Sequence, residues 1–148
     1  MFLLKDLPGD EIMSAYANRF PEMDKMATRD ALRLLQRASF LMRALEGLFS
    51  THGLSQTRFL ILIVLEREGG QLTGTAIRER IDISRPVMTT TLRGLEREGF
   101  VTIGEAPDSR RALQVTLSDA GKAKLAEVLP QYFSLIKERM CTKDEEQR

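Results

Sequence analysis

The stretch "TGTAIRERIDISRPVMTTTLRGLEREG", residues 73–99, carries the start and stop signals of two short helices in succession. Thr73 is a good cap for a first helix over about 74–80, and Gly99 is a typical residue to end the second. Residues 81–84 form the turn between them. The buried face of the second helix is predicted from apolar residues at helical spacing: Met88, Leu92 and Leu95. Such a helix pair is the motif that places its second helix in the major groove of DNA.

The start of the second helix has two interpretations. Ser84 is the natural N-cap, and Pro86 fits the first turn, where a missing N–H has no partner within the helix. However, Arg85 precedes a proline and should therefore be extended, which would make Arg85 itself the cap.

A β-hairpin is expected next, with strands over Phe100–Ile103 and Ala112–Leu117 and a loop over Glu105–Arg111. Arginines at a narrow hairpin tip suit the minor groove of DNA, where negative potential attracts guanidinium groups. In this interpretation Asp108 aims Arg110, Ser109 donates to a phosphate, and Arg111 reaches the DNA backbone. The alternative is a solvated turn, since Pro-Asp-Ser is ordinary turn chemistry.

Helices flank this central region. The pattern predicts a short helix over Asp10–Phe20, a long amphipathic helix from Thr28 to the His52-Gly53 stop, and a third helix from Ser55 to Gly69-Gly70. Ser118 caps a final long helix, which Pro130 should kink or break. The order predicts a mainly α protein with a small β-hairpin (α+β), a winged helix-turn-helix with helical extensions at both ends.

Length and composition fit one compact unit of 148 residues, 43% hydrophobic and 29% charged. No apolar run approaches the ~18 residues of a membrane span, and no signal peptide is evident, so we expect a cytoplasmic protein without membrane association. The net charge of +1 gives little support to nucleic-acid binding. All 13 basic residues between positions 28 and 117 are nevertheless arginine. Arginine suits bidentate contacts to phosphate or guanine, although a GC-rich coding bias would give the same skew.

Two stretches resemble the MarR family of bacterial transcription regulators: "HGLSQTRFLILIVLEREGGQLTGTAIRERIDISRPVMTTTLRGLEREGFV", residues 52–101, and "PDSRRALQVTLSDAGK", residues 107–122. The resemblance implies a homodimer that reads a pseudo-palindromic operator in double-stranded DNA, and a repressor released by a small aromatic or lipophilic effector. It divides the chain into N-terminal dimerisation helices (1–50), a winged DNA-binding module (51–117), and a C-terminal dimerisation helix with its tail (118–148).

The second helix and the hairpin tip supply most of the expected DNA contacts. Threonine offers a methyl group to thymine and a hydroxyl to phosphate or base. The residues expected at the DNA are Thr75, Ser84, Arg85, Pro86, Thr89, Thr90, Arg93, Asp108, Ser109, Arg110 and Arg111.

Apolar residues outside the winged module are the candidates for dimerisation: Ile12, Tyr16, Leu129, Phe133, Ile136 and Met140. A short module has no room to bury both sets, so a partner chain is the expected cover. Phe40, Arg43 and Phe59 could line an effector pocket, because two aromatic rings and a cation suit a small aromatic acid. The alternative is that both phenylalanines belong to the core and that Arg43 is solvated.

Three other functions compete with DNA binding. An enzyme is disfavoured because the only histidine, His52, has no evident catalytic partners, and no metal or cofactor site is expected. A winged helix that binds proteins is disfavoured by the arginines Arg85, Arg93, Arg110 and Arg111. A redox regulator would have to use Cys141, the only cysteine, which is better interpreted as an inert thiol.

Overall fold

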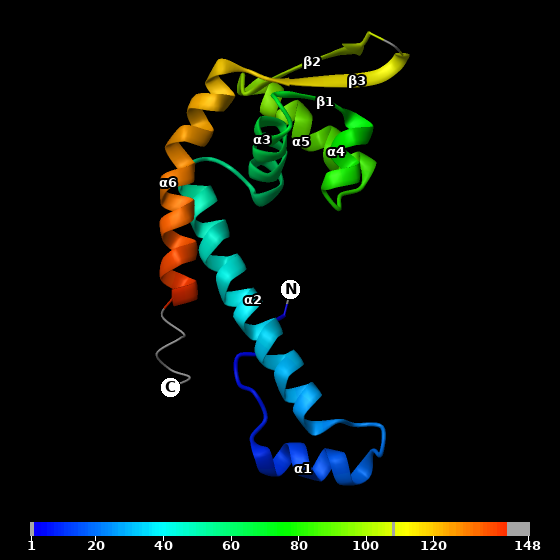
Figure 1. The fold of residues 1–148 in the computed structure, drawn as a ribbon, viewed down its shortest axis with the longest axis vertical. Helices are drawn as coiled ribbons and strands as arrows, with labels where there is room; N and C mark the ends of the chain where they lie inside the picture. Colours follow the sequence, from blue (N-terminus) through cyan, green and yellow to red (C-terminus); the bar gives the residue numbers. More distant parts are fainter. Residues whose placement is uncertain (1, 108, 142–148) are drawn as a thin grey trace. The chain divides into compact units, whose positions relative to one another are not determined.

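The computed structural model describes residues 2–107 and 109–141, and for residues 109–111 it describes the backbone alone. The chain forms two compact units, Met1–Ala44 and Leu45–Arg148. Within the described residues the order of elements in Figure 1 is α1 (Asp10–Arg19), α2 (Lys25–Thr51), α3 (Gln56–Arg67), β1 (Gln71–Thr73), α4 (Gly74–Arg80), α5 (Arg85–Arg97), β2 (Val101–Ala106), β3 (Ser109–Leu117) and α6 (Asp119–Cys141).

The first unit consists of α1 and the longer part of α2. The Asp24 carboxylate accepts the backbone N–H of Ala27 at 2.8 Å, so α2 begins at Lys25 rather than at Thr28 as expected. Asp10 pairs with Lys25 at 2.7 Å and with Arg29 at 2.6 Å. Hydrogen bonds from these two cations lower the pKa of Asp10, and the pairs hold the start of α1 against the start of α2.

The second unit is built around α3, whose side chains are buried on most of its circumference. Phe59 stacks on Phe49 with ring centroids 4.4 Å apart, and Tyr132 of α6 lies 4.9 Å from Phe59. The fully buried residues come from every helix of the winged module, two strands and α6: Phe59, Ile61, Leu62, Leu65, Ile77, Leu92, Leu95, Val101, Val115, Leu125 and Val128. One hydrophobic core therefore joins α6 to the helix pair and the sheet.

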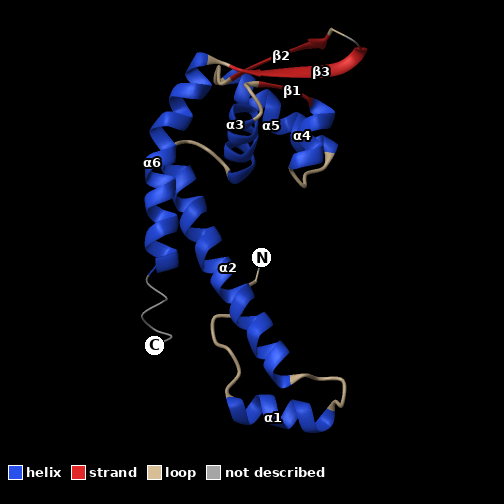
Figure 2. Ribbon diagram, viewed as in Figure 1, coloured by secondary structure: helices blue, strands red, loops and turns tan. Residues whose placement is uncertain are grey.

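The three strands of the described chain form one antiparallel sheet in the order β1-β3-β2, with β3 in the centre (Figure 2). Leu72 and Ile103 both pair with Val115. The sequence did not predict β1, because three residues are too few to show an alternating pattern. The hairpin arms are also longer than expected. The predicted loop over Glu105–Arg111 was too long, since strand pairing continues to Ala106 and Ser109.

Most helix ends agree with the sequence. Ser55 and Thr73 cap α3 and α4 by accepting backbone N–H groups at 3.1 Å. Gly99 has φ +79 directly after α5, as a left-handed C-terminal residue requires.

The last helix, α6, continues through Pro130 from Asp119 to Cys141, so of the two outcomes expected at this proline, a kink or a break, the break does not occur. Pro130 itself is exposed, whereas Val128 before it is fully buried and Tyr132 after it packs on the core. The packing of these neighbours offsets the one backbone hydrogen bond that proline cannot donate.

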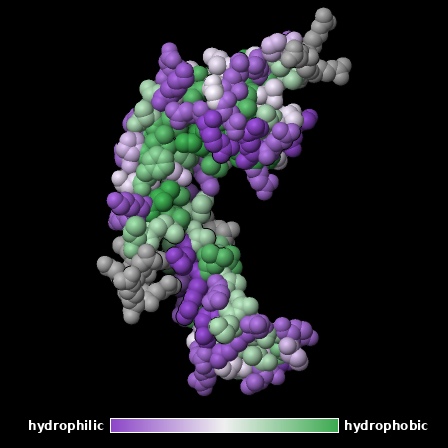
Figure 3. All heavy atoms as spheres, in the orientation of Figure 1, coloured by the Kyte–Doolittle hydropathy of each residue, from purple (hydrophilic) through white to green (hydrophobic). Residues whose placement is uncertain are grey.

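Apolar as well as polar residues reach the surface in both units (Figure 3). No single helix among the described residues is long and apolar enough to cross a membrane. The helices α2 and α3 meet the criteria of length and composition only when they are taken together across the bend between them.

Candidate nucleic-acid interface

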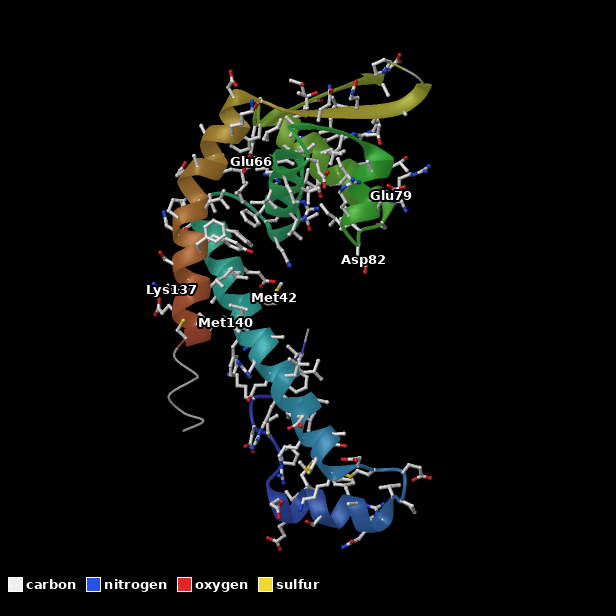
Figure 4. The ribbon with its side chains drawn as sticks, viewed as in Figure 1. Met42, Glu66, Glu79, Asp82, Lys137 and Met140 are labelled. Carbon is white, nitrogen blue, oxygen red and sulfur yellow. The ribbon has the colours of Figure 1, made fainter. Side chains whose placement is uncertain are left out.

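The helix pair α4–α5 is held to α3 by a cation at the end of α4. Arg80 donates from Nε to the Glu68 carboxylate at 3.0 Å and from Nη1 to the carbonyl of Ala76 at 2.9 Å. The hydrogen bond from Arg80 lowers the pKa of Glu68, the residue at the end of α3. Glu79 and Asp82, the acidic residues of this segment, extend into solvent (Figure 4).

Ser84 is the N-cap of α5, with extended backbone and a side-chain oxygen that accepts the N–H of Val87 at 3.3 Å. Arg85 is the first helical residue, so the alternative in which Arg85 is the cap is wrong. The hydrogen bond from Val87 to Ser84 satisfies an N–H group that would otherwise be unpaired, and this outweighs the bias of a pre-proline residue toward extended backbone.

One face of α5 is open to solvent and the opposite face is buried. Arg85, Pro86, Thr90 and Arg93 are exposed, and Thr89 is half-buried. The Thr89 hydroxyl donates to the carbonyl of Arg85 at 3.0 Å. Within the described part of the chain the Thr90 hydroxyl has no such partner, so it is available to an external group.

The other predicted contact from the helix pair, Thr75, is exposed in the first turn of α4. Since Ser84 is also exposed, every predicted contact residue from α4, the turn and α5 reaches the surface at least in part. The structure therefore exposes polar and cationic groups along α5, at its N-cap and in the first turn of α4.

The predicted contacts of the hairpin tip are described only in part. The backbone of Ser109, Arg110 and Arg111 forms the start of β3, and an irregularity in the register lies between Glu105 and Ala106 on β2. Asp108 and the side chains of residues 109–111 lie outside the described residues. The aiming of Arg110 by Asp108 therefore remains a prediction.

The three residues predicted to line an effector pocket belong to both compact units. In the first, the guanidinium of Arg43 lies 5.9 Å from the ring centre of Phe40, which is 44% exposed. In the second, Phe59 is 2% exposed, with its ring stacked on that of Phe49 and tilted against that of Tyr132. Contact between Phe59 and a ligand would require this aromatic core to open.

The predicted dimerisation residues are mostly exposed, at 53% for Ile12, 49% for Tyr16, 60% for Phe133 and 47% for Met140, the last of which is labelled in Figure 4. Ile136 is half-buried, and Leu129 packs on the core. Other apolar residues that were not predicted as dimerisation residues are exposed as well, among them Phe20, Leu34 and Leu35.

The side chain of His52, the only histidine in the sequence, contacts two residues of α6. The Nδ1 atom of His52 lies 3.1 Å from a carboxylate oxygen of Glu127, and Nε2 lies 3.2 Å from the side-chain oxygen of Gln131. These contacts join the residue after α2 to α6 within the second unit. Cys141 is exposed, and the described residues contain no group of His, Cys, Asp and Glu arranged to hold a metal ion.

Known proteins share this architecture. The model of the MarR family matches residues 52–112. The HTH-type transcriptional repressor YetL of Bacillus subtilis is 28% identical over 146 residues, which cover 98% of this chain and 87% of that protein.

Two solved structures are similar in fold. Sco3205 from Streptomyces coelicolor, a MarR family regulator in complex with DNA, has a TM-score of 0.77 at 18% identity, over 84% of this chain and 81% of that one. The organohalide-sensing regulator RdhR-CbdbA1625, bound to 2,4-dichlorophenol, has a TM-score of 0.71 at 18% identity, over 99% and 82%.

The family model covers α3, the helix pair and β2 and ends within β3, while YetL and both structures extend the similarity over most of the chain. These similarities agree with the capped helix pair, the three-stranded sheet and the flanking helices. The chain is therefore similar to MarR family regulators in sequence over residues 52–112, and it shares the fold of the two solved regulators over most of its length.

Proposed function

We propose that this protein is a transcriptional regulator that binds double-stranded DNA sequence-specifically, with α5 as its recognition helix. The observation that carries the proposal is the solvent-facing side of α5, on which Thr90 and Arg93 stand exposed opposite a buried apolar face. A polar and cationic face on a helix fixed to a rigid core is what reading a major groove requires.

The dimensions and polarity of α5 suit this role. Its 13 residues span about 20 Å, and a B-DNA major groove about 12 Å wide admits an α-helix. The positive end of the helix dipole lies beside Ser84 and Arg85, where a phosphate would be stabilised. Arg93 can donate to guanine or to phosphate, and Thr90 can offer its methyl group to thymine and its hydroxyl to a base edge.

The hairpin provides a second contact in this proposal. Its arms are paired as far as Ala106 and Ser109, so the arginines that follow Ser109 in the sequence stand at the far end of the wing. Guanidinium groups there would enter a narrow minor groove beside the major groove that holds α5. Arg110 is the proposed groove contact, and Arg111 would bind the DNA backbone.

The proposed regulator acts as a homodimer on a pseudo-palindromic operator. Exposed apolar side chains at both ends of the chain support this, because a second copy would remove them from water: Ile12, Tyr16, Phe133 and Met140. Two winged modules related by twofold symmetry would read half-sites about 10 base pairs apart, one turn of the duplex.

We further propose repression that a small aromatic or lipophilic effector relieves. The regulator bound to 2,4-dichlorophenol supports an effector of this class, and the cation of Arg43 beside the ring of Phe40 would suit an aromatic acid. The distance between the two recognition helices of the dimer decides whether both can enter the operator. An effector can release DNA only if it binds the conformation that cannot bind DNA more tightly than the conformation that can.

A gel-shift titration with the DNA upstream of the protein's own gene tests the proposal. Wild-type protein should shift a discrete fragment at low salt, and Thr90→Ala and Arg93→Ala should weaken that shift. Arg139→Ala in α6 makes the same charge change as Arg93→Ala outside the helix pair and should bind as wild type. Failure of the wild type to shift any fragment would favour the winged helix that binds proteins.

A further inference from the structure

A glycine lies in the middle of α5, although glycine is among the least favourable residues in a helix interior. Gly94 is buried on the side of α5 that faces α3. A Cβ atom at this position would overlap Nη2 of Arg58 and lie 3.0 Å from Cζ and 3.3 Å from Nε of the same residue. The missing side chain thus leaves the space that the Arg58 guanidinium occupies.

The same guanidinium is tied to the end of α5. Arg58 donates from Nη1 to the Glu98 carboxylate at 2.9 Å, and Glu98 is the residue that ends the helix. Gly94 and Glu98 are four residues apart and therefore lie one above the other on the same side of α5. Arg58 spans both positions, with its cation at the negative end of the helix dipole.

The base of this arrangement is rigid. Arg58 lies in the first turn of α3, where its backbone N–H donates to the cap residue Ser55 at 3.1 Å. Phe59 directly follows it and is buried in the core, as is Ile61. The Arg58 side chain is only 28% exposed, so it is held between two helices rather than free in solvent.

We propose that Arg58, Gly94 and Glu98 form a clamp that fixes the rotation of α5 about its own axis. The inference rests on the proposed function, because the clamp matters only if α5 reads DNA. Gly94 is next to Arg93 and one turn from Thr90, so a rotation that frees the clamp would move both outward side chains away from the base edges. Arg58 is then a positioning residue for specificity and makes no contact with DNA itself.

The Gly94→Ala variant can show whether the clamp positions α5 for DNA binding or only stabilises the folded protein. The overlapping atoms are the far end of a flexible side chain, so Arg58 can swing aside while the fold is kept. Because alanine favours the helix, the unfolding midpoint should stay level or rise. Operator affinity should fall about tenfold, as expected when one base contact is lost, while binding to unrelated duplex should change less than about twofold.

Replacing Arg58 tests the same contact from its other side. Arg58→Met should lower operator affinity like Gly94→Ala, and adding Gly94→Ala to Arg58→Met should then have no further effect, because the two changes break one contact. Arg58→Lys should restore part of the affinity through its charge on Glu98. The dependence of log K on log salt should keep the wild-type slope in Arg58→Met, since no phosphate contact is lost.

The possible results distinguish a failure of the clamp from a failure of the proposed function. Specific wild-type binding with an unchanged Gly94→Ala affinity would overturn the clamp and leave the proposed function in place. Additive losses in the double variant, or a shallower salt slope in Arg58→Met, would equally overturn it in favour of a direct contact to DNA. A wild type without operator preference would overturn the proposed function and the clamp together.

Discussion

The side-chain hydroxyl of Ser84 accepts the backbone N–H of Val87 at 3.3 Å, and this hydrogen bond begins the proposed recognition helix. The cap makes Arg85 helical even though a proline follows it. The residue that stabilises α5 is therefore also one of the exposed residues nearest to the proposed phosphate site at its N-terminus.

Substitutions at Ser84 can separate its two roles. Ser84→Ala should lower the free energy of unfolding by about 1 kcal/mol through loss of the cap, measured by denaturant titration. Ser84→Asp and Ser84→Asn both keep a capping oxygen and should retain stability, but the added carboxylate should repel phosphate and weaken DNA binding. Equal DNA affinities for the Asp and Asn variants would argue against a phosphate at this helix end.

The packing of α6 on the sheet gives a stability prediction. A Cβ at Gly121 would overlap the carbonyl oxygen of Phe100 and lie 2.6 Å from Cδ1 of Leu117. Backbone cannot move aside as a side chain can, so Gly121→Ala should cost about 1–3 kcal/mol of unfolding free energy. Gly47→Ala, in a helix with open space around the glycine, is the control and should be neutral or stabilising. If Gly121→Ala leaves the free energy of unfolding unchanged, the backbone at the end of the sheet can move to accommodate the added Cβ, contrary to this prediction.

Much of the fold was predictable from capping chemistry. Ser55, Thr73 and Gly99 mark helix ends in both the sequence and the structure, because each satisfies a backbone group or a backbone angle locally. The strand β1 was not predicted, and the sequence did not decide between a kink and a break of α6 at Pro130, because both features depend on packing against distant residues.

In the candidate site, too, some features follow from local sequence patterns and others depend on contacts between distant residues. Helical spacing was enough to place Thr90 and Arg93 on the outer face of α5. The contact of Arg58 with Glu98 joins residues 40 positions apart, and no local pattern indicates it. The sequence shows at Gly94 only that a glycine lies inside a helix, which calls for an explanation from packing but does not name Arg58 as the neighbour.

The wing is best tested by a double-mutant cycle on Asp108 and Arg110. Arg110→Ala should weaken operator binding by about 1–3 kcal/mol without loss of fold, measured by fluorescence anisotropy. Asp108→Ala should cost less and act through the same arginine, so the double variant should lose less than the sum. Strictly additive losses would refute the aiming role of Asp108.

The dimer is tested at Phe133, whose side chain is 60% exposed and so should tolerate a polar replacement within the single chain. Phe133→Lys should shift sedimentation from dimer to monomer, because a buried charge in an apolar interface is costly. Ala126→Lys adds the same charge at another exposed position of α6 and should leave the dimer intact. A wild type that sediments as a monomer, or a Phe133→Lys variant that remains dimeric, would point to a different interface.

Selection from a pool of random duplexes, followed by sequencing of the bound fraction, shows directly whether α5 reads a DNA sequence. If a dimer reads DNA through α5, one inverted repeat with half-sites about 10 base pairs apart should be enriched. Thr90→Ala and Arg93→Ala should change the preferred bases within each half-site, while Arg139→Ala should select the wild-type sequence. A bound fraction without a common sequence, or the same sequence selected by every variant, would contradict recognition through α5.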